Sequence, residues 1–489
     1  MHKTVLSVLT LLALVGCVNV PSLRQPELDL PGTWGGPVQA EGSHSRLPAP
    51  DWWKSFGDAQ LDALVEEALT HNTDIRMAAA NIEEARANLG MTLADEGVQA
   101  QGTVDVKRTR RSQRGSMPAP GSPINDSFQF QLQAAYELDL WGRLREASEA
   151  ARADLLASEY AREVVRTSLI GDVAQAYFSL RALDAQLDLV EQTLGNRRAA
   201  EDLQRLRLEA GVASELDMRQ AQAERAALEA NRAQLTQTIG QQELALAVLV
   251  GRSPRALVQD GVTRGQSLQA LQGLVEPPAI PVGLPSQLLQ RRPDLRQAEQ
   301  RLRAAHARIR EAKAAVYPDL ELSAYLGSES KALANLFSGP AAVWGVGVGI
   351  VQSILNGGRT QAALDIRDAQ QTQALLAYEQ TARQAFREVL DALIVHRQAR
   401  EQAQAEDRRS AALGSSLNIA ELRYRNGLTS YLTVLDAQRN LLQADLNRIE
   451  ARRAQLVAAA SLAKALGGGW QDNREARADT LTSRETASN

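Results

Sequence analysis

The chain has 489 residues, with 54 basic and 58 acidic side chains and a formal net charge of −4. Neither sign of charge dominates, and beyond short arginine clusters the sequence has no basic stripe that would indicate a nucleic-acid partner. Aromatic residues make up only 4% of the chain. Such a composition is typical of long, closely packed helices rather than of a thick aromatic core.

The amino terminus is laid out as a secretory signal peptide. A basic start is followed by an apolar run from 5 to 15, which is too short to span a membrane. Gly16-Cys17 then resembles the bacterial lipoprotein box, so residues 1–16 are expected to be removed and Cys17 to be lipidated. Val18, the next residue, favours the outer membrane in that pattern. Acyl chains on Cys17 would anchor the chain to membrane lipid. An ordinary secretory signal with an incidental cysteine is the alternative.

Three further segments are expected to lack a packed core. Residues 17–50 are rich in proline and show little periodicity, which indicates an extended, lipid-anchored tether. Residues 254–285 are also rich in proline and are interpreted as a linker or equatorial segment. The tail, 471–489, is polar and is expected to be disordered. Cys17 is the only cysteine in the sequence, so no internal disulfide can form.

Four short runs alternate apolar and polar residues with a period of two, which predicts strands with one apolar and one polar face. They lie at 103–107, 127–141, 320–326 and 344–350. Glycines occupy the polar face of the last run. A helical pattern precedes the first run and continues from Trp52 to Leu89.

The helices between these runs are predicted to be very long. From Gly142 to Gly211 the sequence has no proline and keeps a heptad-like apolar spacing. If this whole stretch is helical it extends for about 100 Å. That length is several times the size of an ordinary globular domain, so we expect helical hairpins of the coiled-coil type.

One offset relates the two halves of the chain. Gly142-Arg143 recurs as Gly358-Arg359, and 358 − 142 is 216. The same offset relates glycines 211 and 251 to glycines 427 and 467. An offset held over so many positions indicates two copies of one supersecondary unit. We assign the first repeat to 51–253 and the second to 286–470.

The strands and the helices together limit the architecture. A strand of about ten residues with an apolar outer face is the unit of an outer-membrane barrel, which needs at least about eight strands. One chain supplies four, and free strand edges are too costly in lipid. Three chains that together close a twelve-stranded barrel meet both conditions, with long helices extending into the periplasm. A soluble sheet packed on helices, or a solid helical rod, is the alternative.

Several motifs resemble those of the outer-membrane efflux proteins of the TolC and OprM type, in their lipoprotein branch. The resemblance implies a homotrimeric channel-tunnel in the outer membrane that passively conducts small molecules. It also implies two partners, a periplasmic adaptor (membrane fusion protein) and an inner-membrane pump of the RND type. The matching segments are DWWKSF at 51–56, LDLWGR at 138–143, RPDLRQAE at 292–299, YP at 317–318, LDAQR at 435–439 and ALGGGW at 465–470.

The same resemblance assigns the adaptor contact to the tips of the two helical hairpins. A glycine in each tip permits the positive φ of a tight reversal. A plain turn without a partner is the alternative. The tip residues are Gly211, Val212, Ala213, Ser214, Gly427, Leu428, Thr429 and Ser430.

A gate is expected beside the second tip. Leu432 and Asp436 are i, i+4 neighbours on one helix face, and the matching pair narrows the periplasmic end in relatives. Three copies of Asp436 would form a carboxylate ring that attracts cations; a plain solvated aspartate is the alternative. The TolC pattern also implies a closing link between Tyr424 and Asp217. The arginine that assists this link in that pattern is replaced here by Thr429.

Other classes of function find less support in the sequence. The five histidines show no metal-ligand spacing, and neither a nucleophile elbow nor a phosphate-binding glycine loop is present in the sequence. We therefore expect no enzyme activity, no cofactor and no metal site. Two alternatives remain: an outer-membrane channel for type I protein secretion, and a non-conducting coiled-coil lipoprotein that tethers the outer membrane.

Overall fold

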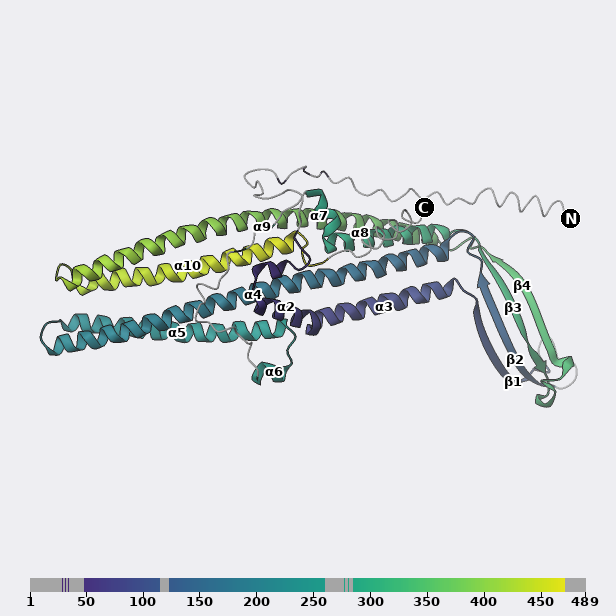
Figure 1. Ribbon diagram of the computed structural model, residues 1–489. Helices are drawn as coiled ribbons and strands as arrows, with labels where there is room; N and C mark the ends of the chain where they lie inside the picture. The colour runs from purple at the N-terminus through teal and green to yellow at the C-terminus, as the bar shows by residue number, and fades with distance from the viewer. Residues whose placement is uncertain are drawn as a thin grey trace, which may run out of the picture. The chain divides into compact units, whose positions relative to one another are not determined.

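The computed structural model describes residues 48–114, 123–259 and 285–470, together with the single residues 29, 31, 34, 277 and 280. The expected signal peptide, Cys17, most of the tether, most of the linker and the tail lie outside the described residues. In chain order the elements (Figure 1) are η1 (Trp52–Phe56), α2 (Ala59–His71), α3 (Thr73–Asp95), β1 (Gln99–Arg110), β2 (Ile124–Glu137), α4 (Arg143–Glu209), α5 (Glu215–Leu249), α6 (Pro254–Gln259), α7 (Pro285–Arg291), α8 (Pro293–Ala314), β3 (Asp319–Ser330), η2 (Leu333–Asn335), η3 (Gly339–Ala341), β4 (Ala342–Val351), α9 (Arg359–Arg425) and α10 (Tyr431–Ala465).

The chain divides into two compact units. Among the described residues, the first unit consists of 81–159 and 297–379, and it contains the four strands. The second consists of the remainder, and it contains α5, α10 and the parts of α4 and α9 that follow residues 159 and 379. None of the described helices combines the length and the apolar character that a membrane-spanning helix needs.

The internal duplication is visible in the bounds of the helices. Helices α4 and α9 each have 67 residues, and their starts at 143 and 359 are 216 positions apart. Helices α5 and α10 each have 35 residues, and their starts at 215 and 431 show the same offset. Strands β1 and β3 each have 12 residues and start at 99 and 319, which are 220 positions apart. The predicted duplication and the predicted long helices are confirmed.

The four strands form one antiparallel sheet in the order β1-β2-β3-β4. Its apolar face is open, and Trp344 on β4 is 73% exposed. Val104 and Val106 on β1, like Val346 and Val348 on β4, are exposed on the same face. The predicted alternation is therefore confirmed, and β1 and β3 extend beyond the predicted runs at both ends.

The second strand ends earlier than the alternation predicted. The predicted run continued to 141, whereas β2 ends at Glu137. Arg143, at the start of α4, holds Glu137 through a hydrogen bond of 2.5 Å from Nη2 to Oε2. The indole of Trp141 stacks on Tyr317, with ring centroids 4.9 Å apart, and its Nε1 donates to the carbonyl oxygen of Pro318. These contacts turn the chain from the strand into the helix, so the apolar residues after Glu137 belong to a junction.

The helical region from 52 to 89 is interrupted, in contrast to the continuous pattern read from the sequence. Asn72 separates α2 from α3 and caps α3, because its Oδ1 accepts from the backbone N–H groups of Asp74 (2.7 Å) and Ile75 (3.3 Å). Its Nδ2 donates to the carbonyl oxygen of Leu249 at 2.8 Å. The break thus ties the end of α5 to the start of α3.

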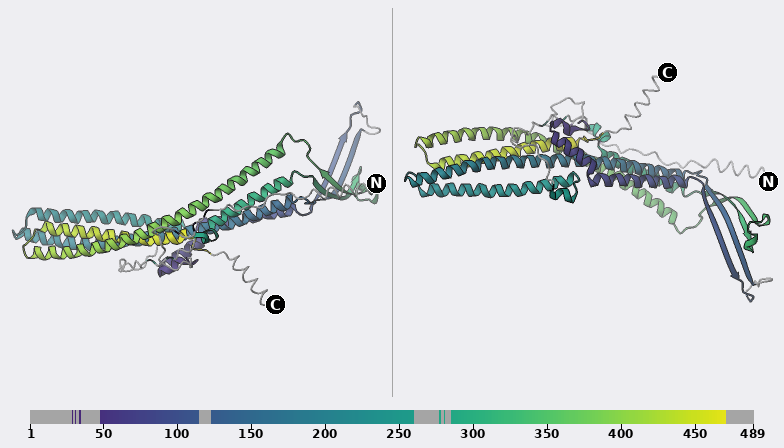
Figure 2. Two further views of the ribbon diagram at one scale, coloured as in Figure 1. Left: turned by 90° about the horizontal axis from the view of Figure 1, so that it is seen from above. Right: turned by 60° about the horizontal axis from the view of Figure 1, so that its bottom comes forward.

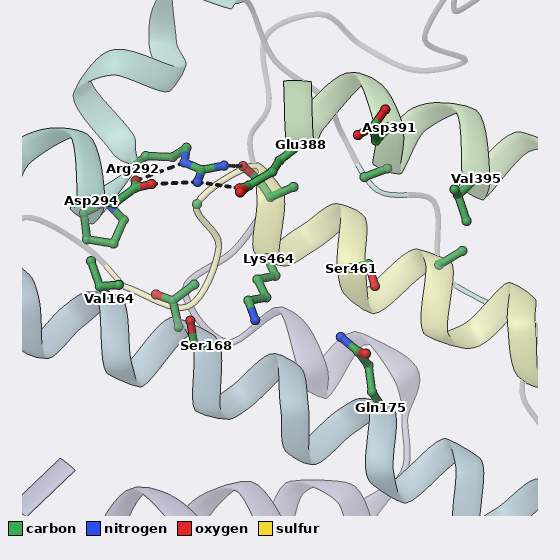
Figure 3. Close-up of a pocket in the computed structure, with 16 residues that line it drawn as sticks. Val164, Ser168, Gln175, Arg292, Asp294, Glu388, Asp391, Val395, Ser461 and Lys464 are labelled. Atoms are coloured by element: carbon green, nitrogen blue, oxygen red, sulfur yellow. Dashed lines mark hydrogen bonds and ion pairs between the residues drawn. The ribbon is translucent and has the colours of Figure 1, made fainter. Parts of the chain in front are cut away.

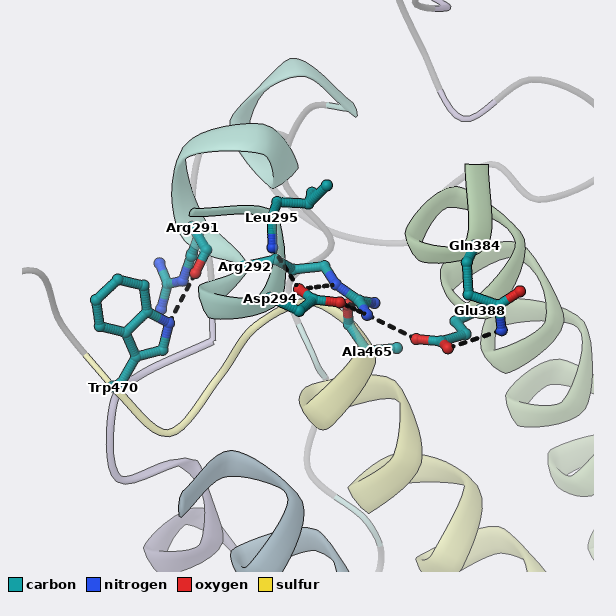
Figure 4. A network of polar contacts seen from close by, with 8 residues as sticks. All are labelled: Arg291, Arg292, Asp294, Leu295, Gln384, Glu388, Ala465 and Trp470. Carbon is teal, nitrogen blue, oxygen red and sulfur yellow. Dashed lines mark hydrogen bonds and ion pairs between the residues drawn. The ribbon is translucent and has the colours of Figure 1, made fainter. Parts of the chain in front are cut away.

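Both repeats build this joint, with different side chains. Gly251 has φ +79°, and a Cβ there would lie 2.5 Å from the backbone of His71. Gly467, 216 positions later, has φ +74° and lies against the backbone of Arg291. In the second repeat, Arg292 takes the place of Asn72: its Nη1 donates to the carbonyl oxygen of Ala465 at 3.0 Å (Figure 4).

The second unit holds the main hydrophobic core. Trp52, Trp53 and Phe56 of η1 are buried against α4, α5 and α10. The hydroxyl of Tyr177 donates to Oδ2 of Asp58 at 2.5 Å beside this core. Further along, leucines of α4 and α5 form a smaller core with α10 packed against it, and the two hairpins lie side by side in all views (Figure 2).

Candidate functional site at the hairpin tips

The two hairpin tips are copies of one tight turn. Gly211 has φ +74° and Gly427 has φ +72°, a conformation in which glycine carries no Cβ penalty. The N–H of Val212 donates to the carbonyl oxygen of Arg207 at 2.9 Å, and the N–H of Leu428 donates to that of Arg423 at 2.9 Å. This is the bonding pattern by which a helix end satisfies its last carbonyls. The backbone hydrogen bonds of each turn are therefore made within its own hairpin.

The tips expose one large apolar side chain each. Val212 and Leu428 are both about two-thirds exposed, at 65% and 68%. Ser214 and Asp217 form a reciprocal capping box at the start of α5. At the second tip, Ser430 makes no such cap, and the hydroxyl of Thr429 donates to that of Thr433 at 2.9 Å. The two tips share a backbone but present different polar groups.

Tyr424 is held by the first repeat, but not through Asp217. Its hydroxyl accepts from Nη1 of Arg207 at 2.7 Å and from Nε2 of Gln204 at 3.3 Å. The guanidinium of Arg207 also lies 5.4 Å from the centre of the Tyr424 ring. Asp217 is used instead in its own capping box, where its Oδ2 accepts from the hydroxyl of Ser214 at 2.9 Å. The expected Tyr424–Asp217 pair is therefore not brought together within the chain.

No pattern in the sequence identifies Arg207 as the partner of Tyr424. Arg207 lies on α4, whereas Tyr424 lies near the end of α9, so no local spacing connects them. The only signal was indirect: the pattern of relatives includes an arginine near this tyrosine, and Thr429 stands at that position. Below Tyr424, the ring of Tyr431 packs at 5.7 Å, and a small core with Ala221 and Leu435 fills the space between the hairpins.

Leu432 and Asp436 share an exposed face of α10, as predicted from their spacing. Leu432 is 43% exposed, and the Asp436 side chain is 54% exposed. The carboxylate of Asp436 is not isolated, because Nη1 of Arg439 lies 3.3 Å from its Oδ1. Nε of Arg439 in turn donates to Oε1 of Glu224 on α5 at 2.7 Å. The guanidinium of Arg439 is charged at neutral pH, and the hydrogen bond with Glu224 raises its pKa further.

A buried arginine completes this group of charges. Arg197 on α4 is 4% exposed, donates to Oε1 of Gln438 and lies 3.8 Å from Glu224. Burial lowers the pKa of Arg197, and the charge of Glu224 opposes that effect. Arg197 and Arg439 thus balance Glu224 and Asp436. This charge network spans α4, α5 and α10, and it differs from a bare ring of carboxylates.

A cavity of about 630 Å³ in the second unit is the other candidate (Figure 3). It is lined by α4, α9, α10 and the start of α8. Its charged groups are already paired: Nζ of Lys464 lies 3.2 Å from Asp172, and Nη2 of Arg292 lies 2.7 Å from both Asp294 and Glu388. The cavity is therefore part of the packing between these helices, and the hairpin tips are the better candidate for a functional site.

Within the described ranges, no group of three histidine, cysteine or acidic side chains could hold a metal ion. His306 lies 3.1 Å from Nε2 of Gln371, and burial lowers its pKa. His396 is half-buried on α9, and burial lowers its pKa as well. The two histidines lie in different units.

Comparison with known proteins gives consistent matches over nearly the whole chain. The profile of the family described as outer membrane efflux protein matches residues 64–252 and 284–468. The chain is 35% identical over 467 residues to the cation efflux system protein CusC of Escherichia coli O6:H1, covering 94% of this chain and 97% of that protein. It is 36% identical over 497 residues to the probable efflux pump outer membrane protein TtgC of Pseudomonas putida, covering 98% and 99%.

Solved structures agree with these matches. The structure of the open state of the MtrE outer membrane channel of Neisseria gonorrhoeae superimposes with a TM-score of 0.80 at 30% identity, and covers 93% of this chain and 98% of that chain. The crystal structures of CusC give a TM-score of 0.81 at 32% identity, with 93% and 100% covered.

Proposed function

The chain belongs to the outer membrane efflux protein family, and on that premise we propose that three copies form one channel for small-molecule efflux. Each copy contributes four strands to a twelve-stranded barrel and two helical hairpins to a periplasmic tunnel. The observation that carries the proposal is the sheet: its apolar face is open, and its two edge strands, β1 and β4, pair with no further strand among the described residues. Free edges in lipid are prohibitively costly, whereas a barrel closed by three chains has none.

The partners in this proposal are a periplasmic adaptor and an inner-membrane RND-type pump. The tips of the two hairpins supply the contact with the adaptor, since each exposes an apolar side chain, Val212 or Leu428, on a rigid glycine turn. The pump selects the cargo, and the channel conducts it passively. Lipidation of Cys17 would add a membrane anchor, and this assignment rests on the sequence alone.

The gate of the proposed channel lies at Leu432 and Asp436. Both side chains are exposed on one face of α10, close to the second tip. Under threefold symmetry Leu432 would form an apolar collar next to the charge network that contains Asp436. The Tyr424 contacts with Arg207 and Gln204 would hold the second hairpin against the first and keep this constriction narrow.

Planar-bilayer recordings test the proposal. We expect wild-type protein to migrate as a heat-modifiable trimer and to conduct ions, with a conductance that rises when Leu432→Ala is combined with Asp436→Ala. A trimer whose conductance does not change would refute the gate assignment. Protein that neither forms trimers nor conducts would instead favour the tethering lipoprotein.

The protein-secretion alternative has its own discriminating assay. Deletion of the gene should sensitise cells to small toxic compounds if the channel serves an efflux pump. A secretion channel would instead lose an exported protein from the culture medium while leaving compound sensitivity unchanged.

A further inference from the structure

The apolar face of the sheet becomes basic near the turn between β1 and β2. Val104 and Val106 are exposed on the apolar face of β1. Arg108 and Arg110 follow on the same face, because side chains two residues apart lie on one side of a strand. Both arginines are exposed. The apolar face of β1 therefore ends in two exposed guanidinium groups.

Aromatic side chains mark the level at which the apolar surface ends. Phe128 of β2 lies opposite Val106, and Phe130 lies on the same face of β2. The exposed ring of Phe337 lies 6.2 Å from the ring of Phe130. In outer-membrane barrels, aromatic residues gather where the hydrocarbon meets the headgroups. The two arginines come next along the strand, about 7 Å and 14 Å beyond Val106.

The chain order places this turn at the outer surface of the membrane. Strand β1 follows α3 and β2 leads into α4, so the turn lies at the ends of the two strands that are not joined to helices. In the channel proposed above, on which this inference rests, the helices extend into the periplasm. The two arginines therefore lie at the depth of the outer-leaflet headgroups.

The charge around this turn is strongly one-sided. Residues 106–126 include five basic side chains and a single acidic one, Asp126. Nε of Arg108 lies 3.4 Å from Oδ1 of Asp126. Arg110 and Arg111 are exposed and pair with no acidic side chain among the described residues. The turn thus presents more positive charge than the chain itself neutralises.

The second repeat shows that a strand of this kind does not need the arginines. The two hairpins share one register, since Gln99 pairs with Ala135 and Asp319 pairs with Val351; 319 − 99 is 220, and 351 − 135 is 216. At the offset of 220, the positions of the two arginines are occupied by serines, 328 and 330. The matching turn, 326–342, has one basic and one acidic residue. The basic pair is therefore an addition to the first hairpin that strand pairing does not require.

Phosphate is the group that this arrangement recognises best. A guanidinium can donate two parallel hydrogen bonds to one phosphate, which makes arginine a favoured residue for phosphate recognition. A phosphate-bearing lipid also has acyl chains, and these would cover the valines directly below the arginines. A free anion would gain nothing from that apolar strip, so the combination favours a lipid.

We propose that Arg108 and Arg110 bind a phosphate group of an outer-leaflet glycolipid, whose acyl chains lie along Val104 and Val106. Arg111, one residue further along, adds positive charge beside the same headgroup. The first hairpin of each copy then carries one lipid site, and the second hairpin carries none.

A binding assay with lipid A tests this site. The probe is lipid A with two phosphates, added in detergent micelles to purified, delipidated trimers of the full chain. Arg108→Ser and Arg110→Ser give the first hairpin the side chains of the second, so trimers and conductance should persist. A cationic side chain near an anionic lipid surface contributes about 1 kcal/mol, so each substitution should weaken binding about fivefold and the double variant about 25-fold.

Lys107→Gln is the matched control. Lys107 lies on the same strand, one residue away, but on the polar face, where its Nζ lies 3.2 Å from Asp105. Its loss should leave the affinity for lipid A unchanged. A second control is lipid A from which both phosphates have been removed, which should bind the wild type and the double variant equally.

A loss of affinity in Lys107→Gln as large as in the double variant would overturn the proposal, because it would indicate a general effect of charge. Equal affinity of the wild type for lipid A with and without phosphates would also overturn it. Displacement of lipid A by millimolar inorganic phosphate would indicate a free-anion site instead. Each of these results, obtained with trimers that conduct ions, leaves the channel itself intact, whereas the absence of trimers in the wild type overturns the channel and the lipid site together.

Discussion

The contact between Arg207 and Tyr424 allows a direct test of whether this pair holds the second hairpin against the first. Arg207→Ala removes a hydrogen bond of 2.7 Å from a charged donor and a cation–π contact at 5.4 Å. Such a hydrogen bond contributes about 1.5 kcal/mol, and the ring contact at this partly buried site contributes about 0.5 kcal/mol. If the contact holds the proposed gate closed, the closed state of each protomer should therefore lose about 2 kcal/mol, which is about a 30-fold shift in the equilibrium between closed and open states.

Single-channel recording measures this shift as the ratio of open to closed dwell times. Arg205→Ala is the matched control, because Arg205 lies about half a helical turn away and, among the described residues, pairs with the exposed Asp202 alone, at 2.8 Å. Tyr424→Phe removes the hydroxyl and keeps the ring, so its effect should be about tenfold. The double variant should open only slightly more than Arg207→Ala alone, because the two changes share the Arg207–Tyr424 contact and the second adds only the loss of the longer Gln204 hydrogen bond at 3.3 Å. An Arg207→Ala channel that behaves like Arg205→Ala, or a double variant whose effects add, would refute the reasoning.

Two further predictions concern stability. Gly251→Ala should destabilise the folded chain by about 3 kcal/mol or more, because the residue has φ +79° and its Cβ would meet the His71 backbone. Gly240→Ala, in open space on α5, should instead stabilise the chain by about 1 kcal/mol. Equal melting temperatures for the two variants would contradict this prediction. Burial, assisted by the charge of Arg400, lowers the pKa of His396 below its usual 6.5. As the pH falls, His396 therefore takes up its proton in the unfolded chain before it does so in the folded chain. The free energy of unfolding should fall as the pH drops below about 6.5. His396→Gln should reduce this acid sensitivity in urea titrations without abolishing it, since burial also lowers the pKa of His306; an unchanged pH profile would argue against the role of His396.

The sequence by itself determined the elements and their repetition. A period of two predicts strands with one apolar face, and proline-free heptad spacing between Gly142 and Gly211 predicts the 67 residues of α4. These features are local: they depend on backbone geometry and on which face of one element is apolar. The constant offset then assigns the same elements to the second repeat without any knowledge of packing.

Only the tertiary structure decided the partners of the polar side chains. Asn72 interrupts a continuous helical pattern because it reaches the carbonyl of Leu249, far along the chain. Arg439 of α10 bonds to Glu224 of α5, and Tyr424 bonds to Arg207 rather than to Asp217. Such pairings depend on how far each helix is rotated about its axis and shifted along its neighbour. No pattern within one helix encodes that rotation, because it follows from the packing of all the hairpins together.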